Sequence, residues 1–224
     1  MYIAIEGAIG VGKTTLARLL QPAFQSKLLL EVFEENPFLS DFYSNRSRYA
    51  FQTQIFFLLS RYHQQRQVMV DFQPGDGNLL ADYTFEKDAL FASINLEGDE
   101  LDVYYRVHEA LAEKVTAPDL VVYLRASTDT LMGRIAQRDR PYERKMDRGY
   151  IEQVNQEYEV FFSNREQRRS PVLAIDTNRL NYVQNEEDLK WIENRIRELL
   201  RMPPYQSELL KENSVGDRGA ARGD

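Results

Sequence analysis

Residues 7–14 read GAIGVGKT and match the phosphate-loop pattern G-x-x-x-x-G-K-[ST] at every fixed position. This pattern limits the fold, because its glycines let backbone N–H groups turn inward around a phosphate, at a turn between a strand and a helix. The flanks agree: residues 2–5 are typical of a short strand, and residues 15–20 have the pattern of a helix that we expect to end near Pro22. The N-terminal segment therefore predicts a site for a nucleoside triphosphate.

The last two positions of the motif carry its charge chemistry. Lys13 is expected to reach the β- and γ-phosphate oxygens, and Thr14 opens the helix, so that its hydroxyl can hold Mg²⁺. The unpaired N–H groups and the positive dipole end of that helix also favour an anion. We predict that ATP, or another triphosphate donor, contacts Gly7, Ala8, Ile9, Gly10, Val11, Gly12, Lys13, Thr14 and Thr15.

The composition fits one domain with a small-molecule partner. A chain of 224 residues with 43% hydrophobic residues can bury one sizeable core, which we place in residues 1–202. The net charge of −7 argues against nucleic acid or an anionic membrane as a partner, because both select for basic surfaces. Residues 203–224 are polar, and residues 216–224 have no apolar period, so we expect a disordered tail.

The cysteine content and the apolar runs limit the metal sites and the cellular location that we expect. The chain has no cysteine, which excludes disulfides and thiolate metal sites, and its two histidines argue against zinc. The longest strongly apolar run, residues 55–59, is too short to span a bilayer. We therefore expect a cytoplasmic protein that does not enter the membrane.

Five short apolar runs alternate with helical patterns along the chain. Such alternation predicts an α/β fold, with a parallel sheet covered by helices on both faces. In such sheets ligands bind beyond the carboxyl ends of the strands. Asp82 ends the third run and resembles a metal-binding Walker B carboxylate, so we expect it to hold Mg²⁺ together with Thr14. The runs cover residues 2–5, 27–33, 79–81, 119–124 and 171–176, and Gly7, Glu31, Asp82 and Asp176 lie at or just past their ends, with Asp176 expected on the donor side.

Residues 45–70 have the pattern of one long helix. Tyr49, Gln52, Phe56 and Leu59 recur along one face at spacings of three or four, so Gln52 is a polar residue in an apolar stripe. Its amide either lies at the rim of the stripe or points into a pocket, and the spacing alone favours neither interpretation.

A basic cluster follows the fourth strand. Ser127 or Thr128 can cap a helix that carries Arg134 and Arg138, and the sequence RPYERK continues from Arg140. Like charges four residues apart on a helix repel by roughly 0.2–0.5 kcal/mol. An anion bound between the two arginines would offset this repulsion and would be held by both guanidinium groups. Alternatively the arginines form a solvated basic face. We place an arginine-rich lid at about residues 134–147.

Several of these stretches together resemble one enzyme family. They are IEG leading into the phosphate loop, Glu31 followed by EENP at residues 34–37, FQT at residues 51–53, the helix with Asp88 at residues 85–91, and Arg134, Arg138, Arg140 and Glu143. From Met1 to about Ile196 the chain resembles the deoxynucleoside kinases of the deoxyadenosine/deoxyguanosine and deoxycytidine kinase family.

The resemblance implies a P-loop kinase fold, a homodimer and ATP-dependent phosphorylation of the 5′-hydroxyl of a deoxynucleoside. It assigns Glu31 as the general base, Gln52 and Asp88 as readers of the nucleobase, and the lid arginines as phosphate ligands. Tyr43 and Glu143 would hold the sugar 3′-hydroxyl. The Asn-Pro that ends the EENP stretch resembles the purine-preferring bacterial members, and so favours deoxyadenosine or deoxyguanosine as the substrate.

One departure stands out. Where the family has Asp/Glu-Arg-Ser after the third strand, this chain has Asp82-Tyr83-Thr84, so the arginine that steadies the base and the transferred phosphoryl group is missing. Lys87, one helical turn further on, is a possible substitute.

Two other functions also use a phosphate loop. A nucleoside monophosphate kinase, such as a thymidylate kinase, shares the phosphate loop and the lid, but needs an arginine for the acceptor phosphate near Glu31, where this chain is acidic. A GTP-binding switch needs the motifs Asn-Lys-x-Asp and Asp-x-x-Gly, and the chain contains neither. The sequence therefore favours the deoxynucleoside kinase.

Overall fold

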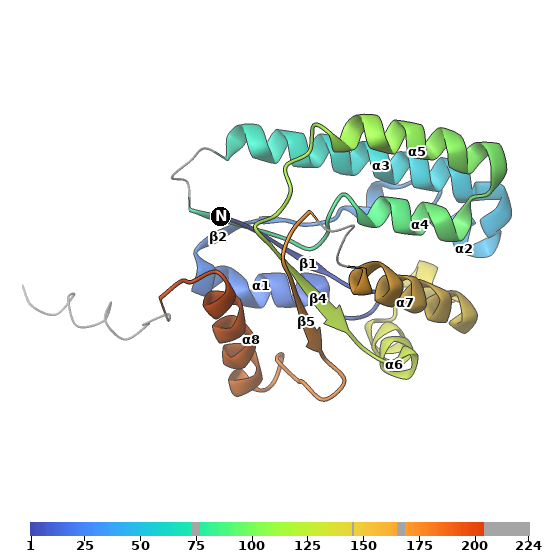
Figure 1. Cartoon of the computed structure of the whole chain (residues 1–224). Coiled ribbons are helices and arrows are strands. Elements are labelled where there is room, and N and C mark those ends of the chain that lie inside the picture. Colours follow the sequence, from blue (N-terminus) through green and yellow to red (C-terminus); the bar gives the residue numbers. More distant parts are fainter. Residues whose placement is uncertain (73–76, 145, 165–168, 204–224) are drawn as a thin grey trace, which may run out of the picture.

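The computed structural model in Figure 1 describes residues 1–72, 77–144, 146–164 and 169–203. Its centre is a five-stranded sheet in the order β2-β3-β1-β4-β5, in which all neighbours are parallel, as the sequence predicted. The predicted tail from residue 204 onward lies outside the described residues. The strands are β1 (Tyr2–Glu6), β2 (Ser26–Leu29), β3 (Asn78–Ala81), β4 (Leu120–Arg125) and β5 (Val172–Asp176).

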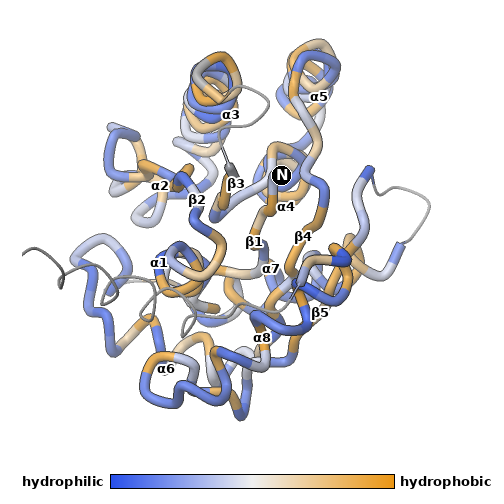
Figure 2. Tube along the Cα trace, turned by 90° about the vertical axis from the view of Figure 1, so that its left-hand side faces the viewer, coloured by the Kyte–Doolittle hydropathy of each residue, from blue (hydrophilic) through white to orange (hydrophobic). Residues whose placement is uncertain are grey.

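Helices cover both faces of the sheet. Figure 1 shows α1 and α8 on one side and α3, α4 and α5 on the other, and α7 packs against α4 and α6. Viewed from the side, β1 and β4 form a hydrophobic layer between these helices (Figure 2). The helices are α1 (Lys13–Phe24), α2 (Leu39–Ser44), α3 (Arg46–Asp71), α4 (Lys87–Asn95), α5 (Gly98–Ala112), α6 (Thr128–Arg138), α7 (Arg148–Ser163) and α8 (Glu186–Leu199), with 3₁₀ turns η1 (Phe33–Glu35) and η2 (Pro141–Glu143).

A buried carboxylate ties the phosphate loop to its neighbours. Glu6, the last residue of β1, is fully buried, and its oxygens accept hydrogen bonds from the Gly7 N–H (3.1 Å), the Thr84 N–H (2.6 Å) and the Tyr158 hydroxyl (3.1 Å). A buried charge needs such partners to offset its desolvation. Glu6 therefore fixes the start of the loop against the end of β3 and against α7.

The structure departs most from the sequence predictions at three elements. α1 continues through Pro22 to Phe24, because a proline in the last turn removes only one helical hydrogen bond, and the Gln25 N–H caps the Pro22 carbonyl at 3.2 Å. β2 ends at Leu29, so that Glu31 lies two residues beyond the strand. The short helix α2 was not predicted.

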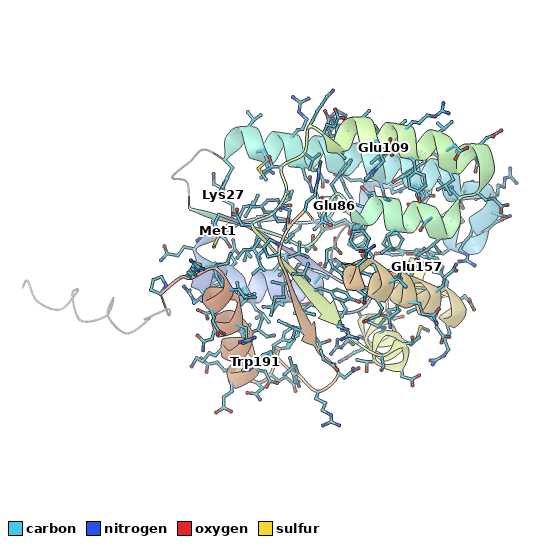
Figure 3. The ribbon with its side chains drawn as sticks, viewed as in Figure 1. Met1, Lys27, Glu86, Glu109, Glu157 and Trp191 are labelled. Carbon is cyan, nitrogen blue, oxygen red and sulfur yellow. The ribbon has the colours of Figure 1, made fainter. Side chains whose placement is uncertain are left out.

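The surface of α8 carries the single tryptophan. Trp191 is 48% exposed and projects from α8 on the side of the molecule away from α3 and α5 (Figure 3). Its fluorescence is therefore a probe of unfolding that is remote from the strand ends. Among the described residues, no helix is long and apolar enough to cross a membrane.

Candidate active site

The phosphate loop has the backbone that its glycines predict. Gly12 has a φ of +105°, and a Cβ there would collide with the Tyr182 hydroxyl, so glycine is required at this position. Lys13 Nζ donates to the carbonyls of Gly7 (2.7 Å) and Ala8 (3.3 Å), which holds the ammonium at the loop. Burial, followed by repulsion from the Lys87 ammonium, lowers the pKa of Lys13 to about 8.

A cavity of about 120 Å³ opens beyond the carboxyl ends of β1, β2 and β3. Its lining comes from the phosphate loop, from the segment after β2, from α3 and α4, and from the lid. Glu31 and Asp82 thus face one crevice, as expected from their strand ends, whereas Gly7 and Asp176 do not line it. The predicted site residues on its wall are Ile9, Gly10, Lys13, Thr14, Glu31, Tyr43, Asp82, Arg138, Arg140 and Glu143.

Glu31 lies in this cavity between two cations. Arg61 donates to Oε1 through Nε (3.2 Å) and Nη2, and Lys87 Nζ donates to Oε2 at 2.6 Å. Burial alone would raise the pKa of Glu31, but the charges and hydrogen bonds of Arg61 and Lys87 outweigh it and hold the pKa well below its usual value. Glu31 is therefore ionised at neutral pH and can accept a proton.

The end of β3 joins Glu31 to the phosphate loop. Asp82 accepts a hydrogen bond from the Thr14 hydroxyl at Oδ2 (2.5 Å) and from the Glu31 N–H at Oδ1 (2.7 Å). A hydroxyl and a carboxylate in contact beside a phosphate site are oxygen donors of the kind that Mg²⁺ prefers, with phosphate and water as its other ligands. Thr14 and Asp82 therefore fit the metal role predicted for them.

On α3 the prediction for Gln52 is wrong. Gln52 is exposed, whereas Gln54 is buried and lines the cavity together with Phe57 and Arg61. Apolar residues occur on several sides of this helix, so more than one stripe fits the helical period, and the stripe identified from the sequence is only partly buried, with Gln52 and Leu59 exposed. Gln54, Phe57 and Arg61 follow one another at spacings of three and four residues. That spacing was the signal that could have identified the face of α3 that lines the cavity.

Asp88 does not reach the cavity. It is fully buried on α4, does not line the cavity, and forms an ion pair with Arg61 Nη1. Its predicted direct contact with a nucleobase is therefore wrong, because the Arg61 guanidinium lies on the cavity wall in its place. Arg61, which links Asp88 to Glu31, was missed in the sequence analysis.

The residues predicted for the sugar lie on the lid, which carries Glu143, and on α2, which carries Tyr43. Arg138 donates to both oxygens of Glu143, from Nε at 2.6 Å and from Nη2 at 2.5 Å. Tyr43 stacks on Tyr142 with ring centroids 6.3 Å apart, and burial raises the pKa of Tyr43 well above its ordinary value, so its hydroxyl remains a donor. Arg140 lies over the Phe33 ring, 4.1 Å from its centroid. Lys145, within the predicted lid, lies outside the described residues.

Arg134 has a different role from the predicted phosphate clamp. Its guanidinium donates to the Val11 carbonyl (3.0 Å) and to the hydroxyl (3.0 Å) and carbonyl (2.8 Å) of Thr177. Arg138 pairs with Glu143, so in this structure the two guanidinium groups have different partners and do not form the expected clamp. Arg134 therefore braces the phosphate loop against the segment that follows β5.

A second cavity, of about 430 Å³, lies on the other side of the phosphate loop. Gly10, Gly12, Thr15 and Arg134 form one wall, and residues 180–184 form the other. Asp176 is exposed, accepts hydrogen bonds from Asn178, and lines neither cavity. The prediction for Asp176 is wrong because β5 ends at this residue, before residues 180–184, which are the segment that faces the phosphate loop.

Comparisons with known proteins agree with this geometry. Residues 3–201 match the family model described as deoxynucleoside kinase. The chain is 35% identical to a deoxyguanosine kinase of Bacillus subtilis (strain 168), over 89% of this chain and 97% of that protein, and 32% identical to a deoxyadenosine kinase of Dictyostelium discoideum, over 78% and 71%. A solved deoxyadenosine kinase from M. mycoides with bound dATP has a TM-score of 0.77 and 26% identity, covering 88% of this chain and 100% of that one. The chain belongs to the deoxynucleoside kinase family.

Proposed function

We propose that this kinase transfers the γ-phosphoryl group of ATP to the 5′-hydroxyl of a purine deoxynucleoside. The observation that carries the proposal is Glu31, a carboxylate held ionised by two cations in the same cavity as Lys13. Glu31 accepts the hydroxyl proton, the new O–P bond forms, and the bond from phosphorus to the ADP oxygen breaks. Such transfers depend mainly on positioning and on neutralising charge.

The donor binds at the phosphate loop, whose N–H groups hold the β-phosphate while Lys13 meets the β- and γ-phosphate oxygens. Thr14 and Asp82 hold Mg²⁺, which supplies charge neutralisation at the phosphates when it is bound. Arg138 and Arg140, on the cavity wall, close over the transferred group. Closure also excludes water, which would otherwise compete with the nucleoside.

The acceptor lies across the same cavity. The Gln54 amide offers both a donor and an acceptor to the base edge, and Arg61 adds donors beside it. Two observations support purine preference: the Asn36-Pro37 resemblance, and the names of the two relatives described above, a deoxyguanosine kinase and a deoxyadenosine kinase. We also propose a homodimer, as the family resemblance implies, and a cytoplasmic location, which the lack of cysteine in the sequence favours.

The sugar lies between Tyr43 and Glu143. A carboxylate and a phenol that converge on the 3′-hydroxyl give it an acceptor and a donor, while the Tyr43 ring fills the space beside C2′. An added 2′-hydroxyl would press on that ring, which costs about 10²-fold, and a missing 3′-hydroxyl would leave Glu143 without its ligand and cost more.

Sugar specificity tests this proposal. We expect kcat/KM to fall from deoxyadenosine to adenosine and further to 3′-deoxyadenosine, and Tyr43→Phe to reduce the 3′-hydroxyl effect. Equal values for ribo- and deoxyribonucleosides, or no penalty for the 3′-deoxy analogue, would contradict the sugar assignment.

A further inference from the structure

Lys87 is a buried cation at the catalytic carboxylate. It is 4% exposed, lines the cavity that contains Lys13, and donates to Glu31 Oε2 at 2.6 Å. Tyr83, which replaces the arginine of the family pattern, does not line the cavity: it packs with Tyr2, and its hydroxyl donates to Gln64 at 3.1 Å. At the end of β3 and the start of α4, Lys87 is therefore the side chain that brings positive charge into the cavity.

The hydrogen bonds of Glu31 show which oxygen can accept the substrate hydroxyl. Each carboxylate oxygen has two lone pairs. Both lone pairs of Oε1 are engaged by Arg61, through Nε and Nη2, whereas Oε2 receives one bond, from Lys87. The acceptor hydroxyl therefore binds Oε2, the same oxygen that Lys87 holds.

Sharing one oxygen brings Lys87 close to the reacting atoms. Two hydrogen bonds to the same oxygen place the Lys87 nitrogen within about 5 Å of the attacking 5′-oxygen. The phosphorus approaches that 5′-oxygen to about 3–3.5 Å before transfer. An ammonium has three donors, and Glu31 takes one of those of Lys87, so two can meet oxygens of the phosphoryl group.

The charge on Glu31 changes during the reaction, and the two neighbouring cations respond differently. Arg61 also pairs with Asp88, so it keeps a counter-ion when Glu31 becomes protonated. Among the described residues, Lys87 has Glu31 as its only ion-pair partner. When Glu31 takes the proton, Lys87 loses its ion-pair partner. At the same time the negatively charged phosphoryl group approaches on the other side of Oε2. The attraction between Lys87 and the phosphoryl group therefore strengthens in the transition state.

On the basis of the proposed function, we infer that Lys87 is a catalytic residue that binds the transferred phosphoryl group, with Glu31 Oε2 as the proton acceptor. In the step, the 5′-hydroxyl proton moves to Oε2 and the 5′-oxygen forms its bond to phosphorus. The bond from phosphorus to the ADP oxygen breaks, and ADP leaves with that electron pair. Lys87 exchanges its ion pair with Glu31 for one with the phosphoryl oxygens.

Turnover of Lys87→Met and Lys87→Arg tests the inference, with Lys190→Met as the control that removes a surface Lys–Glu pair of 3.0 Å on α8. We expect Lys87→Met to lower kcat by at least about 10²-fold, with the deoxynucleoside Kd changed by less than a few fold. Lys87→Arg should recover most of that loss, and the control should match wild type. A kcat for Lys87→Met close to wild type, or no recovery with arginine, would overturn the inference.

A binding experiment separates this role from a structural one. Aluminium fluoride with ADP and deoxyadenosine mimics the transferred group, and its complex needs no turnover. We expect Lys87→Met to weaken this complex while ADP alone binds as in wild type and Trp191 fluorescence reports the same unfolding midpoint. Equal weakening of ADP alone would show that Lys87 only supports the fold. If the wild type is inactive but still forms a complex that depends on Lys87, the result contradicts the proposed reaction. It does not contradict the contact between Lys87 and the phosphoryl group.

Discussion

Glu31 owes its chemistry to side chains that are distant in the sequence. Arg61 on α3 and Lys87 on α4 hold its two oxygens, and without them burial would favour the protonated acid. The carboxylate was identified near a strand end and its role as the base from the family resemblance, but its charge state depends on contacts that span 30 and 56 residues. Local sequence patterns do not contain that information.

Glu31→Gln tests the general base. The amide keeps the shape of the side chain but accepts protons poorly, so we expect kcat to fall by about 10²–10⁴-fold. Glu34→Gln, a change at an exposed neighbour, is the matched control and should keep the wild-type rate. If Glu31→Gln stays within a few fold of wild type, another group takes the proton.

Gln54 and Gln52 form a natural pair of variants on one helix. Gln54→Ala leaves a buried base edge without its partner and should lower kcat/KM for every nucleoside by roughly 10- to 100-fold. Gln52→Ala, on the exposed face, should lie within about two-fold of wild type, as surface substitutions usually do. The reverse result would restore Gln52 as the base reader.

At the level of elements, motifs with fixed spacing were predictable and helix faces were not. The phosphate loop and the strand end at Asp82 lie where the sequence placed them, because glycine geometry and apolar runs are local signals. The inner face of α3 was missed, because its apolar residues fit more than one stripe. Arg134 and Arg138 are one turn apart, yet tertiary contacts with Thr177 and Glu143 send their side chains to different partners.

Arg134→Met tests the brace between α6 and the phosphate loop. It removes the hydrogen bonds to Val11 and Thr177 but no group from the nucleoside cavity. Loss of a charged hydrogen bond costs about 1.5–3 kcal/mol, so we expect the ATP KM to rise about ten-fold or more, with the deoxynucleoside KM unchanged. Arg195→Met, which removes a surface ion pair on α8, is the control. An equal rise in both KM values would contradict a role limited to the donor site.

At the scale of the whole molecule, two cavities lie on opposite sides of the phosphate loop. The parallel sheet brings the ends of β1, β2 and β3 to the first cavity, and the segment after β5 closes a second cavity against the other side of the same loop. Gly10 and Arg138 line both cavities, so the proposed acceptor site and the second cavity meet at the phosphate loop and the lid. The match to the deoxynucleoside kinase family model covers residues 3–201, which include every described strand except the first residue of β1. The whole sheet is therefore part of the family fold.

Initial rates of ADP release with different acceptors test the central claim most directly. The acceptors are the four deoxynucleosides and their 5′-monophosphates, each with ATP and Mg²⁺, and the position of the new phosphate is read from the product. We predict the highest kcat/KM for deoxyadenosine or deoxyguanosine, a product phosphorylated at the 5′-oxygen, and no turnover of the monophosphates. Faster turnover of a monophosphate than of any nucleoside would contradict the account, and a comparable kcat/KM for thymidine would contradict its purine preference.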